Sequence, residues 1–314
     1  MKNANRIAIY ICGIFLLALG GVLAIKSNLG ASPVSSLPLS ISKVTSISLG
    51  RAAAILFIIY VGIQILILRR DFKIVQLSDF HSSGYKDTTE IIISKIKGLK
   101  PDIIVMTGDM ISWEVENIGE LEKLITSLAD VAPMYYVNGN HEELAEILKA
   151  EEYGAFLSSI EQLGVTFIKN NYVEISKDSQ CINLYEIDIP LDGPTGLYVS
   201  SGQLDDKYIN DKLDEVDKNK FNILLAHNPL FIDDYSRWGA DLVLSGHMHG
   251  GIIRIPIIGV GIASPEKDYF PKYDAGEFKV GNTTMIVNRG IGASSSGLRV
   301  FNKPEISVIT LKSK

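Results

Sequence analysis

Two histidines stand one residue apart in the stretch DLVLSGHMHGG, residues 241–251, although the chain has only five histidines. On an extended segment, side chains two positions apart point to the same side, so His247 and His249 can present both imidazoles together. Imidazole nitrogen is a common ligand of transition metals. The neighbouring glycines let other backbone approach closely. The spacing therefore predicts two ligands of a metal centre.

Other side chains that can bind metal or transfer a proton follow short apolar runs. The full set is Asp79, His81, Asp109, Asn140, His141, His227, His247 and His249. Taken singly, each has an ordinary structural interpretation, such as a turn aspartate, a helix-capping asparagine or a hydrogen-bonded core histidine. Taken together, the set includes every histidine of the chain, which favours one shared site.

The elements that must position these residues alternate between apolar runs and amphipathic stretches from Phe72 onward. This alternation predicts a layered α/β domain. Runs such as IIVM and ILLA contain no polar alternation, so both faces of these strands should be covered. Ligands of such sheets gather at the carboxyl ends of the strands, which is where the candidate residues fall.

The ordered motifs LSDFH, PDIIVMTGD, VNGNHEE, ILLAHNP and DLVLSGHMHGG resemble those of the calcineurin-like metallophosphoesterases. The closest likeness is to the bacterial branch that carries an N-terminal membrane segment or export signal. The likeness covers roughly residues 72–312. It implies an α/β fold in which a layered β-sandwich is flanked by helices.

The resemblance also implies a role for each candidate residue. One metal ion is expected to bind Asp79, His81, Asp109 and His249. The other is expected to bind Asp109, Asn140, His227 and His247, so that Asp109 bridges the two. His141 is expected to face the substrate and assist the leaving group. Mixed nitrogen and oxygen ligands suit Mn, Fe, Zn or Co, and the identity of the metal stays open.

Two such ions, roughly 3.5–4 Å apart, can activate a hydroxide and hold the oxygens of a transferred phosphoryl group. The expected activity is metal-dependent hydrolysis of phosphodiester, phosphomonoester or pyrophosphate bonds. The alternative is a non-catalytic membrane protein that keeps the fold for metal binding or regulation. The complete ligand set, with His141 present, favours the enzyme.

The N-terminal region contains two apolar runs without charged residues, 7–25 and 52–68. A membrane-spanning helix needs about 20 apolar residues, so both runs are candidate transmembrane helices. A signal peptide is the alternative for the first run. The motifs LGASP and SLGR resemble the first helices of YitT-like membrane proteins. We therefore expect a membrane anchor over residues 1–70, followed by the phosphoesterase domain over 71–314.

The distribution of Lys and Arg predicts the orientation of this anchor. The outer flanks contain five basic residues and the connecting loop contains three: Lys2, Arg6, Arg69, Arg70 and Lys73 against Lys26, Lys43 and Arg51. The excess favours a multi-pass protein of the cell membrane with its catalytic domain in the cytoplasm. A single inserted span would instead place that domain outside.

Composition limits the partners. The formal net charge is −6 and the chain has no long basic run, which argues against nucleic acid. Two distant cysteines, Cys12 and Cys181, exclude a disulfide framework and a cysteine-based metal site.

The apolar segment 252–273, with Tyr269, Phe270 and Tyr273, is either a buried hairpin or a lip that holds the lipid part of a lipid-linked substrate. The sequence does not predict the oligomeric state.

Overall fold

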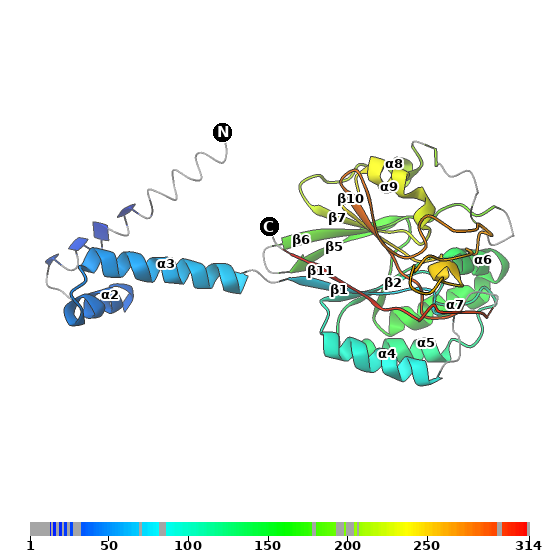
Figure 1. Cartoon of the computed structure of the whole chain (residues 1–314), viewed down its shortest axis with the longest axis horizontal. Coiled ribbons are helices and arrows are strands. Elements are labelled where there is room, and N and C mark those ends of the chain that lie inside the picture. The colour runs from blue at the N-terminus through cyan, green and yellow to red at the C-terminus, as the bar shows by residue number, and fades with distance from the viewer. Residues whose placement is uncertain are drawn as a thin grey trace. The chain divides into compact units, whose positions relative to one another are not determined.

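The computed structural model divides into two compact units, one ending at Asp71 and the other spanning Phe72–Leu311 (Figure 1). The residues that it describes are 13, 15–16, 19–20, 22–23, 26–27, 33–68, 71–81, 86–177, 180–192, 198, 204–205, 207–293 and 297–312. Each unit is described by itself below.

The N-terminal unit contains helices α2 (Pro33–Val44) and α3 (Leu49–Leu68), which pack against each other. The second expected span, 52–68, lies within α3, whereas the first, 7–25, falls largely outside the described residues. Among the described residues, no helix combines the length and the apolar character that a membrane crossing needs. The two transmembrane helices that the sequence predicts are therefore not supported.

The second unit is a layered α/β domain, as the alternating pattern predicts, and it is built on two mixed β-sheets. The first sheet has the order β11-β1-β2-β3-β4, in which β1 to β4 are parallel and β11 is antiparallel to β1. Its strands are β1 (Phe72–Leu77), β2 (Ile103–Thr107), β3 (Met134–Val137), β4 (Val165–Phe167) and β11 (Ser307–Leu311).

The second sheet has the order β5-β6-β7-β8-β10-β9, with parallel pairing from β6 to β10 and antiparallel edges. Its strands are β5 (Asn171–Lys177), β6 (Gln180–Glu186), β7 (Phe221–Leu225), β8 (Leu242–Ser245), β9 (Gly276–Val280) and β10 (Thr283–Val287). Strands β7 and β8 therefore run side by side and end at a common edge.

Helices cover the outer face of each sheet (Figure 1). The first sheet is covered by α4 (Lys86–Leu99), α5 (Gly119–Leu128), α6 (Asn140–Leu148) and α7 (Ala150–Gln162). The second is covered by α8 (Tyr208–Leu213), the short η2 (Pro229–Phe231) and α9 (Ile232–Trp238). Another short helix, η3 (His249–Gly251), follows β8.

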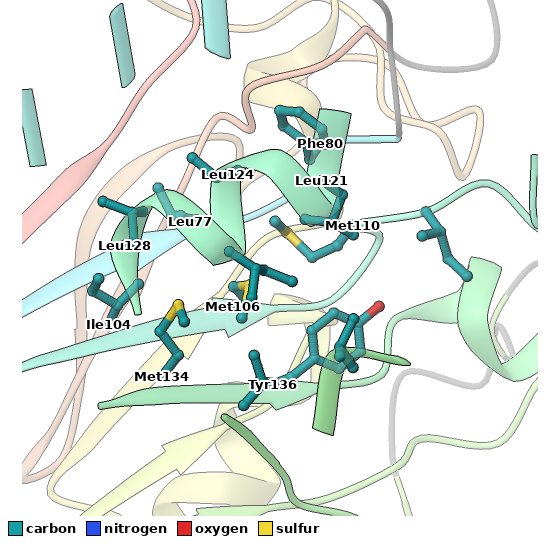
Figure 2. Packing of buried hydrophobic residues seen from close by; sticks show 14 of the residues in the cluster. Leu77, Phe80, Ile104, Met106, Met110, Leu121, Leu124, Leu128, Met134 and Tyr136 are labelled. Atoms are coloured by element: carbon teal, nitrogen blue, oxygen red, sulfur yellow. The ribbon is translucent and has the colours of Figure 1, made fainter. Parts of the chain in front are cut away.

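Alternate residues of the central strands serve different cores, because successive side chains of a strand point to opposite faces. Ile104 and Met106 of β2 pack against the helices, as Figure 2 shows. Ile103 and Val105 of the same strand pack between the two sheets. The prediction that these strands are covered on both faces is confirmed, and the result is a β-sandwich flanked by helices. This packing fixes the strand ends that carry the candidate residues.

Candidate metal centre

Strained backbone marks the loops that follow the strands. Five of the seven predicted ligands have positive φ angles, a conformation that non-glycine residues adopt uncommonly. They are Asp79 (51°), His81 (51°), Asp109 (52°), His247 (68°) and His249 (46°). Such strain gathers at functional sites, where the surrounding structure holds it in place. Here it turns side chains from different loops into one pocket.

The first group consists of Asp79, His81, Asp109 and His249, whose ligand atoms all lie within 4.8 Å of one another. The Nε2 atoms of His81 and His249 are 3.0 Å apart. His249 Nε2 is also 3.3 Å from Asp79 Oδ1. Ligand atoms about 2.0–2.2 Å from a shared ion lie roughly 3–3.5 Å from each other, so this spacing fits a metal ion.

The second group consists of Asp109, His227 and His247, and Asp109 therefore belongs to both. The Nδ1 atom of His227 lies 2.6 Å from the carbonyl oxygen of Thr107. This contact requires Nδ1 to donate, which leaves Nε2 as an acceptor in the neutral ring. Nε2 faces Asp109 Oδ2 at 3.2 Å. Two acceptors at this distance repel each other unless a cation or a proton lies between them, which again fits a metal ion.

Asn140 and His141 begin α6, directly beside these groups. Asn140 is buried. The backbone N–H of His141 donates to Asp109 Oδ1 at 2.9 Å, and its ring contacts the His81 ring edge-on with centroids 4.6 Å apart. The backbone N–H of Trp113 donates to His141 Nδ1 at 3.3 Å. His141 Nε2 therefore carries the proton of the neutral ring.

The electrostatics of the pocket favour neutral imidazoles in the first group. Burial lowers the pKa of His81 to about 3. Burial and the neighbouring His81 hold the pKa of His249 well below its usual value. Neutral histidine is the form that binds metal, so the pocket keeps these two rings ready for an ion at neutral pH.

Carboxylates dominate around the second group. Burial alone would lower the pKa of His227, but the charges of Asp109 and Asp79 and the hydrogen bonds of the ring raise it to about 10. Burial disfavours the charged form of Asp109, yet His227 and His141 hold its pKa well below the usual value. A proton on His227 thus takes the place that a cation can fill.

A buried carboxylate that is not among the predicted ligands joins the loop after β2 to the loop after β3. Glu142 is fully buried, and its carboxylate accepts four backbone N–H groups and one hydroxyl. The donors are Asp109 (2.8 Å), Met110 (2.8 Å), Ile111 (3.0 Å), Gly139 (2.9 Å) and the Tyr136 hydroxyl (2.7 Å). The acid three residues after Gly139 is half of a capping box, a signal that could have identified it in the sequence.

Two further residues at the site carry no sequence signal. Glu266 Oε1 lies 2.7 Å from His247 Nε2. The ring of Tyr198, which is buried, packs edge-on against His247 with centroids 5.0 Å apart. Both come from segments without a recognisable motif.

The apolar segment after the last histidine divides between core and surface. Tyr273 is buried against Phe278, with ring centroids 5.1 Å apart. Tyr269 and Phe270 are exposed, at 79% and 60% of their full surface. The segment is therefore neither wholly a buried hairpin nor wholly a lip, and Tyr273 is not part of any exposed lip.

Two family models match the chain. Residues 72–251 match the model described as calcineurin-like phosphoesterase. Residues 4–84 match a family of unknown function, DUF6198. The likeness of the N-terminal region to YitT-like membrane proteins is therefore not supported by this match.

Curated relatives agree with the first model. The chain is 33% identical over 250 residues to the uncharacterized metallophosphoesterase YkuE of Bacillus subtilis (strain 168). The aligned region covers 77% of this chain and 79% of the relative. It is 28% identical over 243 residues to the phosphodiesterase YaeI of Escherichia coli (strain K12), which covers 76% of this chain and 82% of the relative.

A similar solved structure is TT1561 of Thermus thermophilus, with a TM-score of 0.45 and 12% identity over 70% of this chain and 90% of that chain. The family model spans more than half of the chain, and YkuE exceeds 30% identity over most of both lengths. The chain therefore belongs to the calcineurin-like phosphoesterases and is a metal-dependent hydrolase of phosphoric esters.

Proposed function

We propose that the chain hydrolyses phosphodiester bonds at a centre for two divalent metal ions, with phosphomonoesters and pyrophosphates as further substrates of the same site. The observation that carries this proposal is the position of Asp109, which belongs to both groups of ligand-capable side chains. The name of the relative YaeI, a phosphodiesterase, supports diesters as the first class to test.

The two ions would be held by the residues of the two groups, with Asn140 added to the second. When bound, they supply Lewis-acid activation of water and neutralise charge on the phosphoryl oxygens. His141 would donate its Nε2 proton to the oxygen of the leaving group, because the Trp113 N–H already occupies Nδ1. Glu142 would keep the Asp109 loop in place through its five hydrogen bonds.

The test is Mn²⁺-dependent hydrolysis of bis(4-nitrophenyl) phosphate by the full chain. Asp109→Asn should lower the rate at least about 100-fold, because a shared ligand of both ions loses its charge. Asp268→Asn removes one charge from an exposed residue and should leave the rate unchanged. Equal rates for the wild type and Asp109→Asn would contradict the proposal, whereas metal binding without hydrolysis of any phosphoester would favour a regulatory role.

We further propose that the N-terminal unit attaches the protein to a membrane, with the catalytic unit on the cytoplasmic side. The apolar surface of α3 supports the attachment, since Phe57, Ile58 and Val61 are each more than half exposed. The excess of Lys and Arg in the outer flanks over the connecting loop supports the cytoplasmic side. Such side chains are costly to leave in water. Maleimide labelling of a cysteine added after Lys314, in a background without Cys12 and Cys181, tests the side in intact cells. Labelling without permeabilisation would contradict a cytoplasmic domain.

A lipid-linked phosphoester is the second candidate substrate, favoured by the exposed rings of Tyr269 and Phe270. Replacing both with serine should slow hydrolysis of a detergent-dispersed lipid phosphodiester and leave bis(4-nitrophenyl) phosphate hydrolysis unchanged. Equal effects on the two substrates would remove the lipid from the proposal.

A further inference from the structure

A tight turn in the segment after η3 is folded towards the metal centre. Its base is held by the carbonyl oxygen of Gly251, which accepts the N–H groups of Ile262 and Ala263 at 3.3 Å. Its tip is closed by two backbone hydrogen bonds of 3.0 Å, from Ser264 N–H to Asp268 O and from Lys267 N–H to Ser264 O. The backbone of this turn is therefore defined by its own hydrogen bonds.

Glu266 is the residue of this turn that points inward. Its side chain is only 12% exposed, although its neighbours Lys267 and Asp268 are exposed. Its Oε1 atom lies 2.7 Å from Nε2 of His247, whose side chain is 2% exposed. A carboxylate in a surface turn normally stays in water, because its burial is costly without a hydrogen-bonding partner. The His247 ring provides that partner.

The contact assigns the two nitrogens of His247. A carboxylate is an acceptor only, so Nε2 must carry the proton that lies between the two atoms. The other nitrogen, Nδ1, is then the one left to bind an ion in the second group, to which His247 belongs. His227 of the same group also has one nitrogen that donates and one left for the ion, but the two nitrogens are exchanged, with Nδ1 donating to Thr107 O and Nε2 left for the ion.

We infer, on the basis of the proposed two-ion function, that Glu266 is a positioning residue that holds His247 as an Nδ1 ligand and strengthens the second metal position. A charged acceptor fixes the tautomer and the ring orientation of a ligating histidine and makes it a better electron donor. The first metal position contains neither Glu266 nor His247, so the effect is selective for one ion of the pair.

The experiment counts Mn²⁺ ions bound per full-length chain by equilibrium dialysis with elemental analysis. The wild type should bind two ions. Glu266→Gln keeps an acceptor but removes the charge, and Glu266→Ala removes both. We expect the affinity for one ion to fall about 10- to 100-fold in these variants, with the larger loss for Ala, and the affinity for the other to stay unchanged. The exchange-coupled Mn²⁺ pair signal in EPR should give way to that of a single ion.

Two controls separate positioning from a general structural effect. Asp268→Asn removes the same charge from the same turn on its exposed side and should bind two ions like the wild type. Adding Glu266→Gln to a His247→Gln variant should cause no further loss, because Glu266 acts through His247. The metal-free thermal midpoints of Glu266→Gln and Asp268→Asn should agree.

The remaining outcomes would contradict the role of Glu266, its action through His247, or the two-ion function. Two ions bound by Glu266→Gln with wild-type affinities, or equal weakening of both ions, would overturn the role of Glu266 and leave the phosphoesterase proposal standing. A further loss in the double variant would overturn the route through His247. A wild-type chain that binds no Mn²⁺ would overturn this inference and the two-ion function together.

Discussion

His141 is expected to act in catalysis without binding either metal ion. It lies in neither group of ligand-capable side chains among the described residues, yet its ring touches His81. We expect His141→Ala to keep both metal ions and to lose about 10²- to 10⁴-fold in kcat, the usual contribution of a general acid. Ion counts and rates on the same samples check this. Because 4-nitrophenolate leaves without a proton, an alkyl leaving group should be affected more, and equal losses would contradict the acid role.

The buried carboxyl group of Glu186 makes the stability of the fold depend on pH. Burial, with the charge of Asp188 as a second cause, raises its pKa well above the usual value. Above the ordinary pKa of about 4.3, the unfolded chain releases this proton and the folded chain keeps it, so its contribution to stability falls as pH rises. Glu186→Gln should therefore raise the melting temperature more at pH 8 than at pH 5.

This comparison belongs in chelator-containing buffer, where metal binding does not shift the melting temperature. The Asn170 N–H that Glu186 accepts remains satisfied by a glutamine oxygen. The control is Glu174→Gln, because the pKa of Glu174 is lowered, and not raised, by the hydrogen bond and charge of Lys220. A pH-independent difference between Glu186→Gln and the wild type would show that Glu186 is ionised in the folded protein.

Sequence could reach the ligands but not the groups that orient them. Asp79, Asp109 and His247 each follow an apolar run by two or three positions, so local spacing is enough to find them. Glu266 reaches His247 across 19 positions through a turn, and nothing in the segment between them signals that contact. The roles of the ligands remain predictions, since the geometry brings their atoms together and metal analysis has to assign them.

At the scale of elements, the loop after β8 depends on the absence of a side chain at Gly246. A Cβ atom there would lie 1.9 Å from Ser78 Oγ and 2.5 Å from Asp79 Oδ2. Gly246→Ala must therefore displace the loop after β1, and overpacking of this kind costs about 1–3 kcal/mol. We expect lower thermal stability together with weaker binding of the first ion.

The matched substitution is Gly98→Ala in α4, where an added Cβ would meet no atom within 4 Å. Alanine is better than glycine inside a helix by about 1 kcal/mol, so this variant should be neutral or more stable. Thermal unfolding and Mn²⁺ binding measured on both variants show whether the added Cβ atom is harmful only at Gly246. Normal metal binding by Gly246→Ala would mean that the two loops adapt independently.

The elements themselves were predictable where periodicity was strong. The two buried faces of β2 follow from its unbroken apolar run, because a strand covered on one face alternates with polar residues. The segment around Tyr269, Phe270 and Tyr273 has no such period, and its division into exposed and buried rings depends on distant packing partners such as Phe278. Aromatic content alone could not separate them.

At the scale of the whole catalytic unit, β11 closes the first sheet by pairing with β1, from Phe72↔Leu311 to Gln76↔Ser307. This partner could not be deduced from sequence, since pairing between the two ends of a unit leaves no local pattern. Deleting residues 305–314 should expose the edge of β1, which carries Asp79 beyond its end. We expect aggregation or a much lower melting temperature, together with loss of metal.

The control deletes only residues 312–314, which leaves β11 intact. This variant should fold and bind metal like the wild type. Normal melting and metal binding after the longer deletion would show that β1 holds its position without an edge partner.

The pairing of Phe72 with Leu311 has a consequence for how such a unit can be reused. Its first and last strands are immediate neighbours. Both connections to flanking sequence therefore leave from the same end of β1, whereas the histidines lie beyond the other end. A cassette with adjacent ends can be grafted onto a tether, or inserted within a loop of a host, without pulling its architecture apart. Exchange of the leading helices for another attachment should thus leave turnover intact.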